Sequence, residues 1–307
     1  MHDNMKILTI IVSYNFGPWI DRCLGSLRAS GQPTDVAVID NASKDGTAKR
    51  IKEGYPEVRL VENGSNLGFG QANNIGMKIA LDEGYDAVFL LNQDAWIDRS
   101  TLATLSALSA SHAEYGILSP VHLNGSGTEL DHGFAVYSGH ESLAELKSGF
   151  SARPFDTLQP AAFINAAFWY IPVATLKKVG GFCPLFYHYG EDVDYANRVR
   201  FNGLRIGYCP AVFGCHDRER RKPNRAAWLR SERVYALAQY ADINHSFAHA
   251  FAYGVMGCVK KAAQAAAKCR FADAGAYFAM AAGLAGRTLE VARFRKEDKA
   301  QGPRYIR

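Results

Sequence analysis

The chain is poor in the features that mark secreted, metal-cluster and membrane-spanning proteins. Its six cysteines form no Cys-x-x-Cys pair, so we expect neither a disulfide framework nor a cysteine-bound metal cluster. The first six residues lead directly into an apolar run, and we expect no secretory signal there. The Ala-rich stretch 271–286 is interrupted by Asp273 and is short for a membrane-spanning helix. These absences favour a protein of the reducing cytosol with packed or interfacial C-terminal helices.

Positive charge is concentrated in the last third of the chain. From Asp217 onward there are 18 Lys and Arg against 8 Asp and Glu, a net charge of +10. The first 216 residues carry 17 Lys and Arg against 22 Asp and Glu, a net charge of −5. This asymmetry is typical of binding to an anionic partner, such as a membrane surface or nucleic acid, but a solvated helical surface also explains it. The basic loop 218–225 would cover bound phosphates or face lipid head groups.

Short apolar runs alternate with helical patterns in the first third of the chain. We expect strands at 7–12, 35–40 and 58–62, and a fourth that starts at Ala87 and ends in polar residues 92–94. Helices are expected at 19–29 and 47–53, and a loop at 66–76 opens a third helix that reaches Leu81. Repeated strand–helix units predict a doubly wound, mostly parallel α/β sheet with right-handed crossovers.

The remaining chain extends this fold and ends in helices. Further strands are expected at 115–120, 163–171 and 203–210, and further helices at 101–111, 226–240, 245–258 and 264–293. We interpret His122, His132 and His140 as loop residues, because their spacing forms no compact metal-ligand motif. Trp169 either stacks on a sugar ring or belongs to the core. We divide the chain into residues 1–110 and 111–216, two halves of one domain, and a basic helical region 217–307, whose end at 293–307 is typical of disorder.

The fourth predicted strand ends in a carboxylate. Asn92, Gln93 and Asp94 follow an uninterrupted apolar run, at the edge where open α/β sheets bind ligands. Mg²⁺ commonly takes one or two carboxylates together with substrate phosphates. Asp94 is therefore a candidate for holding a metal against a diphosphate, and the alternative is a residue that caps the following turn.

Polar residues also follow the first two strands and the third. Ser13, Tyr14 and Asn15 end the first strand, and Asp40 and Asn41 end the second. An acid in the position of Asp40 can bind a ribose hydroxyl or a base N–H, or it can simply form a turn. The segment 68–73 resembles a dinucleotide fingerprint but lacks its third glycine, so we discount a nicotinamide site. Its glycines allow close approach of a ligand or a tight turn.

A second group of carboxylates lies at the start of a predicted helix. Glu191, Asp192 and Asp194 follow an aromatic, glycine-containing segment. The helix dipole favours acids at this position, which explains at least one of them. Asp194 is expected to pair with Arg198, one helical turn later. The functional interpretation of Glu191 and Asp192 is that one of them is a general base, which takes the proton of a reacting hydroxyl.

Several of these segments together resemble family 2 glycosyltransferases, and most of all those of the bacterial rhamnosyltransferase type. The similarity rests on motifs that occur in the expected order between residues 7 and 216: Thr-Ile-Ile-Val-Ser-Tyr-Asn at 9–15, Val-Ile-Asp-Asn-Ala-Ser-Lys-Asp-Gly-Thr at 38–47, Asn-Leu-Gly-Phe-Gly-Gln-Ala-Asn-Asn-Ile-Gly at 66–76, Leu-Leu-Asn-Gln-Asp-Ala at 90–95 and Glu-Asp-Val-Asp at 191–194. The resemblance implies a GT-A fold, a nucleotide-sugar donor, a divalent cation, Mg²⁺ or Mn²⁺, and inversion at the anomeric carbon.

The resemblance also implies roles for individual residues. Asp192 corresponds to the catalytic base, with Glu191 as the alternative. Asp94 corresponds to the last residue of an Asp-x-Asp metal motif, with Asn92 in its first position, and His216 would complete the cation site or remain a surface histidine. Asp40 corresponds to the acid that recognises the base. The nucleotide site would comprise Ser13, Tyr14, Asn15, Asp40, Asn41, Asn66, Gly68, Phe69, Gly70, Asn73, Asn74, Asn92, Gln93 and Asp94.

The expected reaction is a single displacement from a dTDP-rhamnose or UDP-hexose donor. The acceptor is a hydroxyl of a glycan or lipid-linked glycan in cell-surface polysaccharide synthesis, at the inner face of the cell membrane, and no nucleic acid is involved. Two partners are left open: a membrane contacted by the basic region, and a second copy of the chain in a homo-oligomer. Two alternative functions remain: a non-catalytic relative that binds a glycan or a nucleotide, and a sugar-phosphate nucleotidyltransferase. The latter should carry a cationic triphosphate loop, and residues 11–17 contain no cation.

Overall fold

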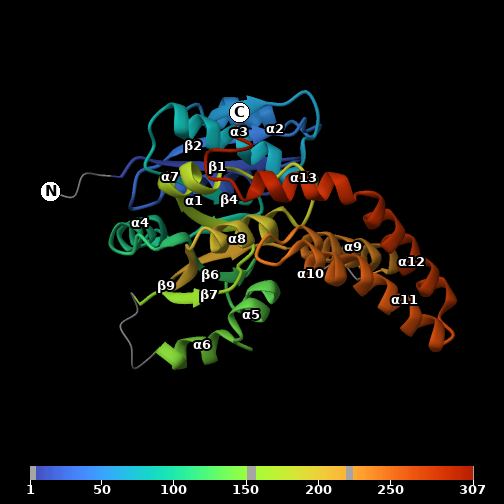
Figure 1. Ribbon diagram of the computed structural model, residues 1–307. Helices are drawn as coiled ribbons and strands as arrows, with labels where there is room; N and C mark the ends of the chain where they lie inside the picture. Colours follow the sequence, from blue (N-terminus) through green and yellow to red (C-terminus); the bar gives the residue numbers. More distant parts are fainter. Residues whose placement is uncertain (1–4, 151–156, 219–223, 307) are drawn as a thin grey trace.

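The computed structural model describes residues 5–150, 157–218 and 224–306, and it confirms the predicted α/β architecture (Figure 1). Most of the predicted basic loop, residues 219–223, lies outside this part of the chain. Within the described residues, nine strands form one sheet in the order β3-β2-β1-β4-β8-β6-β9-β5, and β7 pairs with β9. The strands are β1 (Ile7–Ser13), β2 (Asp35–Asp40), β3 (Arg59–Glu62), β4 (Ala87–Leu91), β5 (Ala95–Ile97), β6 (Tyr115–Asn124), β7 (Gln159–Ala161), β8 (Phe168–Pro172) and β9 (Arg205–His216).

The sheet is parallel in its first half and mixed in its second. β1 pairs in parallel with β2 and β4, and β2 pairs in parallel with β3. β8 is antiparallel to both β4 and β6, and β9 is parallel to β6 but antiparallel to β5. Because β1, β2 and β4 are parallel, their carboxyl ends meet at one edge, where ligands bind in open sheets of this class.

Helices cover both faces of the sheet because alternate strand residues point to opposite sides. Leu8 of β1 packs into a core that includes residues of α3 (Gly68–Asp82), α7 (Val173–Val179) and α8 (Glu191–Phe201). Ile7, the neighbouring residue of β1, packs into a second core with residues of α1 (Ile20–Arg28), α2 (Thr47–Gly54) and α4 (Thr101–Ser111). The first core brings α8, with its carboxylates, against the strands that carry the other predicted site residues.

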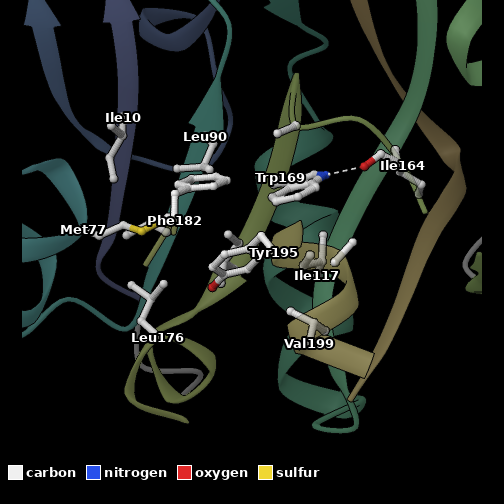
Figure 2. Close-up of a cluster of buried hydrophobic side chains, with 14 of the residues drawn as sticks. Ile10, Met77, Leu90, Ile117, Ile164, Trp169, Leu176, Phe182, Tyr195 and Val199 are labelled. Atoms are coloured by element: carbon white, nitrogen blue, oxygen red, sulfur yellow. Dashed lines mark hydrogen bonds between the residues drawn. The ribbon is translucent and has the colours of Figure 1, made fainter. Parts of the chain in front are cut away.

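Trp169 of β8 is a core residue. Its side chain is fully buried, its indole N–H donates to the carbonyl of Ile164 at 3.0 Å, and its ring stacks on that of Phe182 with centroids 6.1 Å apart. Figure 2 shows Trp169, Phe182 and Tyr195 lying side by side in this core. Of the two interpretations of Trp169, the structure therefore supports packing and not stacking on a sugar.

Two local predictions are wrong. The segment 66–76 is not a loop up to Gly76, since α3 begins at Gly68. His122 is not a loop residue, because β6 continues beyond the expected end to Asn124 and buries it. Its Nε2 lies 2.8 Å from the hydroxyl of Ser119, so a hydrogen bond satisfies part of this polar side chain in the core. The other two histidines lie on or beside α5 (His132–Ser138), which precedes α6 (Leu143–Phe150).

The C-terminal region consists of helices that pack on the segment before α8. They are α9 (Arg225–Ala241), α10 (Phe247–Phe251), the π-helix η1 (Ala252–Met256), α11 (Gly257–Ala267), α12 (Phe271–Gly286) and α13 (Thr288–Asp298). The helix expected at 264–293 is therefore broken twice, by the turn before α12 and at Arg287. In the described residues, no helix combines the length and the apolar character that crossing a membrane requires.

The segment that follows α13 is ordered against the core, so the expectation of disorder at 293–307 is wrong for the described residues. Arg198, buried in α8, donates to Asp194 at 2.9 Å, as predicted, and lies 3.5 Å from Asp298 at the end of α13. Tyr305 donates its hydroxyl to Asp298 at 2.9 Å. Charge pairing thus holds this segment against the helix that begins with Glu191 and Asp192.

Candidate active site

Hydrogen bonds tie the carboxyl ends of β1, β2 and β4 to one another. The hydroxyl of Ser13 donates to Asp40 at 2.7 Å, joining the ends of β1 and β2. The amide oxygen of Gln93 accepts from the backbone N–H of Tyr14 at 2.8 Å, and its amide nitrogen donates to the Tyr14 carbonyl at 3.2 Å. Asn15, at a positive φ of 54°, donates its N–H to Ser43 at 2.8 Å. The predicted residues of three separate segments therefore form one connected edge.

Asn41 extends this edge to the start of α3. Its amide nitrogen donates to the carbonyl of Gly68 at 3.2 Å, and its amide oxygen accepts from Asn63 at 2.9 Å. The amide oxygen of Asn66 accepts from the Gly68 N–H at 2.9 Å. The loop before α3 is thus held beside the end of β2, so that the two segments belong to one candidate site.

The two glycines at the start of α3 serve close packing of the protein on itself. A Cβ on Gly68, whose φ is +79°, would lie 2.1 Å from the carbonyl oxygen of Tyr187. A Cβ on Gly70 would lie 2.9 Å from the Cβ of Phe182. The segment 182–190 therefore lies directly on the start of α3, and this contact explains the glycines without a ligand.

Three more residues predicted for the nucleotide site make structural contacts here. The Asn74 amide oxygen accepts from the N–H of Phe182 at 2.7 Å, and its nitrogen donates to the Phe182 carbonyl at 2.9 Å. The ring of Phe69 packs edge-on against Phe182, and Asn73 donates to the Phe69 carbonyl at 3.0 Å. By contrast, Tyr14 is 48% exposed at the strand ends. The exposed ring of Tyr14 is therefore free to meet a nucleotide, whereas the side chains of α3 are engaged in packing.

Asp94 and His216 lie together although 122 residues separate them in the sequence. The antiparallel pairing of β5 with β9 places Ala95 opposite His216, and the Nε2 of His216 is 3.3 Å from a carboxylate oxygen of Asp94. The amide nitrogen of Asn92 also lies 3.3 Å from this Nε2. His216 is buried, whereas the side chain of Asp94 keeps 25% of its surface exposed. The structure thus brings together both residues predicted to bind a metal.

Glu191 and Asp192 begin α8 but lie in different surroundings. Glu191 is 5% exposed, and burial, with the charge of Asp192 added, raises its pKa to about 8. Asp192 is only half-buried and accepts the backbone N–H of Val193 at 2.9 Å. Burial raises the pKa of Asp192, and hydrogen bonds from the backbone of Val193 and Ala166 oppose this shift. Asp192 is therefore the better candidate for an ionised base.

Comparison with known proteins agrees with the motifs and their arrangement. Residues 9–158 match the family model for glycosyl transferase family 2. An N-acetylglucosaminyl-diphospho-decaprenol L-rhamnosyltransferase of Mycobacterium tuberculosis is 26% identical over 237 residues, which cover 68% of this chain and 75% of the relative. The chain carries a family 2 glycosyltransferase domain. The low-salt glycan biosynthesis hexosyltransferase Agl10 of Haloferax volcanii is 24% identical over 218 residues, covering 71% of this chain and 68% of the relative.

Solved structures show that this glycosyltransferase has the GT-A fold. The mannosyltransferase PcManGT from Pyrobaculum calidifontis, in complex with GDP-Man and Mn²⁺, superposes with a TM-score of 0.56 at 19% identity, covering 99% of this chain and 86% of that one. S. aureus TarS 1–349 in complex with UDP superposes with a TM-score of 0.53 at 16% identity, covering 84% and 72%. The expected fold, including its helical C-terminal part, is therefore confirmed.

Two residues of the candidate site, Asp131 and Tyr137, were missed in the sequence, and Arg218 was predicted only as part of the basic loop 218–225. Asp131, the N-cap residue of α5, lies 3.8 Å from the Nδ1 of His216. Burial and then the charge of Asp192 raise the pKa of Tyr137, and Asp131 adds to the shift. The positive charge of Arg218 acts on both Tyr137 and Asp192. A Cβ on Gly133 would lie within 3.5 Å of atoms of all three residues, so they form one group between the Asp94–His216 pair and Asp192.

Glu191 should make the stability of the protein depend on pH. An ordinary glutamate has a pKa of 4.5, whereas the pKa of Glu191 in the folded protein is about 8. Glu191 therefore holds its proton more tightly in the folded state than in the unfolded state. Its contribution to stability is therefore complete below pH 4.5 and is lost as the pH rises to about 8. We expect Glu191→Gln, which cannot ionise, to gain stability relative to the wild type across this interval in urea unfolding.

The exposed Glu114 provides a matched control, since Glu114→Gln should unfold with the pH dependence of the wild type. Parallel unfolding curves for Glu191→Gln and the wild type from low to high pH would contradict the tightly held proton.

Proposed function

We propose that this glycosyltransferase transfers a sugar, with inversion, from a nucleotide diphosphate donor to a hydroxyl of a lipid-linked glycan in cell-surface polysaccharide synthesis. Rhamnose on dTDP is the first donor to test, and a UDP-hexose is the second. The observation that carries the proposal is the Asp94–His216 pair, 3.3 Å apart at the strand ends, facing the same region as the half-buried Asp192. The rhamnosyltransferase and hexosyltransferase named above support the choice of donor and acceptor.

The proposed chemistry is a single displacement. The acceptor oxygen attacks the anomeric carbon, the bond from this carbon to the diphosphate breaks, and the nucleoside diphosphate leaves with the electron pair. Asp192 receives the proton of the acceptor hydroxyl, for which an ionised carboxylate is required. Glu191 stays protonated at neutral pH and supports the start of α8. Ser13, Asp40 and the other strand-end residues hold the nucleotide.

The residues present fit a divalent cation. A carboxylate oxygen of Asp94 and the Nε2 of His216 lie 3.3 Å apart, and Asp131 lies behind the imidazole at 3.8 Å from its Nδ1. A carboxylate on the far side of a histidine is the usual arrangement behind a metal ligand. When bound, the cation would neutralise the charge that develops on the leaving diphosphate. A site with one imidazole and one carboxylate favours Mn²⁺ over Mg²⁺, because Mg²⁺ prefers oxygen ligands.

The three parts of the chain would have different roles in the transfer reaction. We propose that residues 1–110 bind the donor, that 111–216 bind the acceptor and carry the base, and that the basic region 217–307 lies at the inner face of the membrane. The net charge of +10 from Asp217 onward supports this placement, because anionic lipids attract basic surfaces.

Replacing Asp94 should remove most of the activity. We expect Asp94→Ala to slow nucleoside diphosphate release from the preferred donor by about 10²–10³-fold, the loss typical of one group that stabilises developing charge. Release is measured for a panel of sugar nucleotides with Mn²⁺, Mg²⁺ or chelator. The chelator should have the same effect on the wild type as the substitution.

The control is Asp82→Ala, which removes a surface carboxylate that pairs with Lys78 at 2.9 Å. It should behave as the wild type. Full donor turnover in chelator and in Asp94→Ala would show that the site works without a metal. If no donor is turned over although nucleotides bind, two cases are left: an enzyme that requires its acceptor for turnover, or a binding-only relative.

A further inference from the structure

A groove of about 380 Å³ runs between α9 and α12. α9 lines it with Leu229, Arg230 and Arg233, and α12 lines it with Ala279, Met280 and Gly283. Spacings of three and four residues place each set on one face of its helix. The groove therefore combines two guanidinium groups with a floor of small and apolar side chains.

The two arginines of the groove are available to a ligand. Neither Arg230 nor Arg233 has an ion pair or hydrogen bond to another residue in the described part of the chain, and both are exposed. Arg225, at the start of the same helix, is paired with Asp273 at 2.9 Å. Guanidinium groups bind phosphates through paired hydrogen bonds, so two neighbouring ones suit a diphosphate.

The outer face of α12 is apolar and uncovered. No charged residue occurs from 274 to 286, and Phe271 and Phe278 are 70% and 66% exposed. Lys268 and Arg270 directly precede the helix. Figure 1 shows α11 and α12 projecting from the body of the molecule, away from the sheet. An apolar helix face beside cationic residues fits the interface of an anionic membrane.

The groove also lies beside the helix that carries the proposed base. α9 packs on the residue before Glu191, since a Cβ on Gly190 would lie 3.0 Å from Val234. Burial, and after it the charge of Arg230, lowers the pKa of His188 in the same segment. Arg233 is adjacent to Val234, and Arg230 is ~6 Å from it along the helix axis. A ligand on these arginines is therefore next to the segment that leads to Asp192.

We propose that the groove between α9 and α12 binds the diphosphate of a membrane-held prenyl diphosphate lipid, with the prenyl chain along the apolar face of α12. The sugar attached to the diphosphate then points toward Asp192. This assignment rests on the proposed function, whose lipid-linked acceptor it specifies by chemical class and binding site. Arg230 and Arg233 hold the diphosphate, and Phe271 and Phe278 enter the membrane interface.

Binding to vesicles tests the assignment without any donor or turnover. The full chain is sedimented with phosphatidylcholine vesicles that contain geranylgeranyl diphosphate, phosphatidylglycerol at equal charge, or no anionic lipid. We expect strong binding only with the prenyl diphosphate. Arg230→Ala/Arg233→Ala should weaken it about thirtyfold, and Phe278→Ser about tenfold. The control Arg99→Ala/Arg205→Ala removes two exposed arginines of the sheet domain and should bind as the wild type.

Several results would overturn the assignment. One is equal binding to phosphatidylglycerol vesicles, which would show a general anionic surface. Another is unchanged binding by the double arginine variant at an unchanged melting temperature. A third is a dimer in size-exclusion chromatography that Phe278→Ser dissociates, which would identify a second copy as the occupant of the α12 face. Because no donor is present, failure here is distinct from failure of the proposed transfer, which donor turnover measures separately.

Discussion

Asp192→Asn should reduce sugar transfer by about 10²–10⁴-fold, the range expected when a general base is removed. The substitution keeps the shape of the side chain and its place at the start of α8, so nucleotide binding should survive. Glu191→Gln, one residue earlier, should cost less than about tenfold, because burial already keeps Glu191 protonated at neutral pH and Gln resembles that form. The two adjacent residues thus serve as controls for each other.

The measurement is the initial rate of transfer at saturating donor, together with calorimetric binding of the free nucleotide to each variant. Loss of transfer with retained binding in Asp192→Asn would support its role as the base. If Glu191→Gln is the inactive variant and Asp192→Asn remains active, the two roles are exchanged. Loss of nucleotide binding in Asp192→Asn would instead show that the residue supports the donor site.

Removing Arg198 should have the largest effect on stability. The guanidinium is 1% exposed, and it pairs with Asp194 and Asp298 while also donating to the carbonyls of Val179 and Gly181. We expect Arg198→Ala to lower the free energy of unfolding by about 3–5 kcal/mol, because two buried carboxylates and two carbonyls lose their partner. Urea unfolding followed by circular dichroism measures this loss.

Two further variants keep this prediction testable if Arg198→Ala does not fold. Burial and the charge of Asp194 raise the pKa of Asp298 to about 7, so the uncharged Asp298→Asn should cost much less than Arg198→Ala. Arg200→Ala, on the exposed side of the same helix, should change stability by no more than about 0.5 kcal/mol. Equal losses for Arg198→Ala and Arg200→Ala would show that the buried pairs contribute little.

Local patterns in the sequence predicted most of the fold. The apolar runs of β1, β2 and β4 and the polar residues at their ends predicted the sheet edge where the candidate site lies, because both signals lie within a few residues. The start of α3 was misplaced because two glycines suggested a loop, whereas they make room for Phe182 and the carbonyl of Tyr187. His122 was misplaced because the polar, glycine-rich stretch that starts at Asn124 hid the continuation of β6.

The candidate site was harder to predict because its contacts are distant in the sequence. Motif resemblance, not spacing, suggested His216 as a partner of Asp94, since the pairing of β5 with β9 cannot be read from either segment alone. Asp131 had one local signal, its position as a helix N-cap three residues before Phe134, whose N–H it accepts at 3.1 Å. Arg218 was predicted only as a member of the basic loop 218–225, because nothing in that arginine-rich segment singles it out.

The contact between Arg198 and Asp298 also has a consequence for the timing of synthesis. The two residues are 100 positions apart. At ribosomal speeds of about 5–20 residues per second, Asp298 emerges roughly 5–20 s after Arg198. During this interval Arg198 can pair with Asp194 but not with Asp298. The helix that begins with Glu191 and Asp192 therefore lacks its contact with the end of α13. The sheet can thus form early in translation, whereas the helix that carries the proposed base gains its last contact only near the end of synthesis.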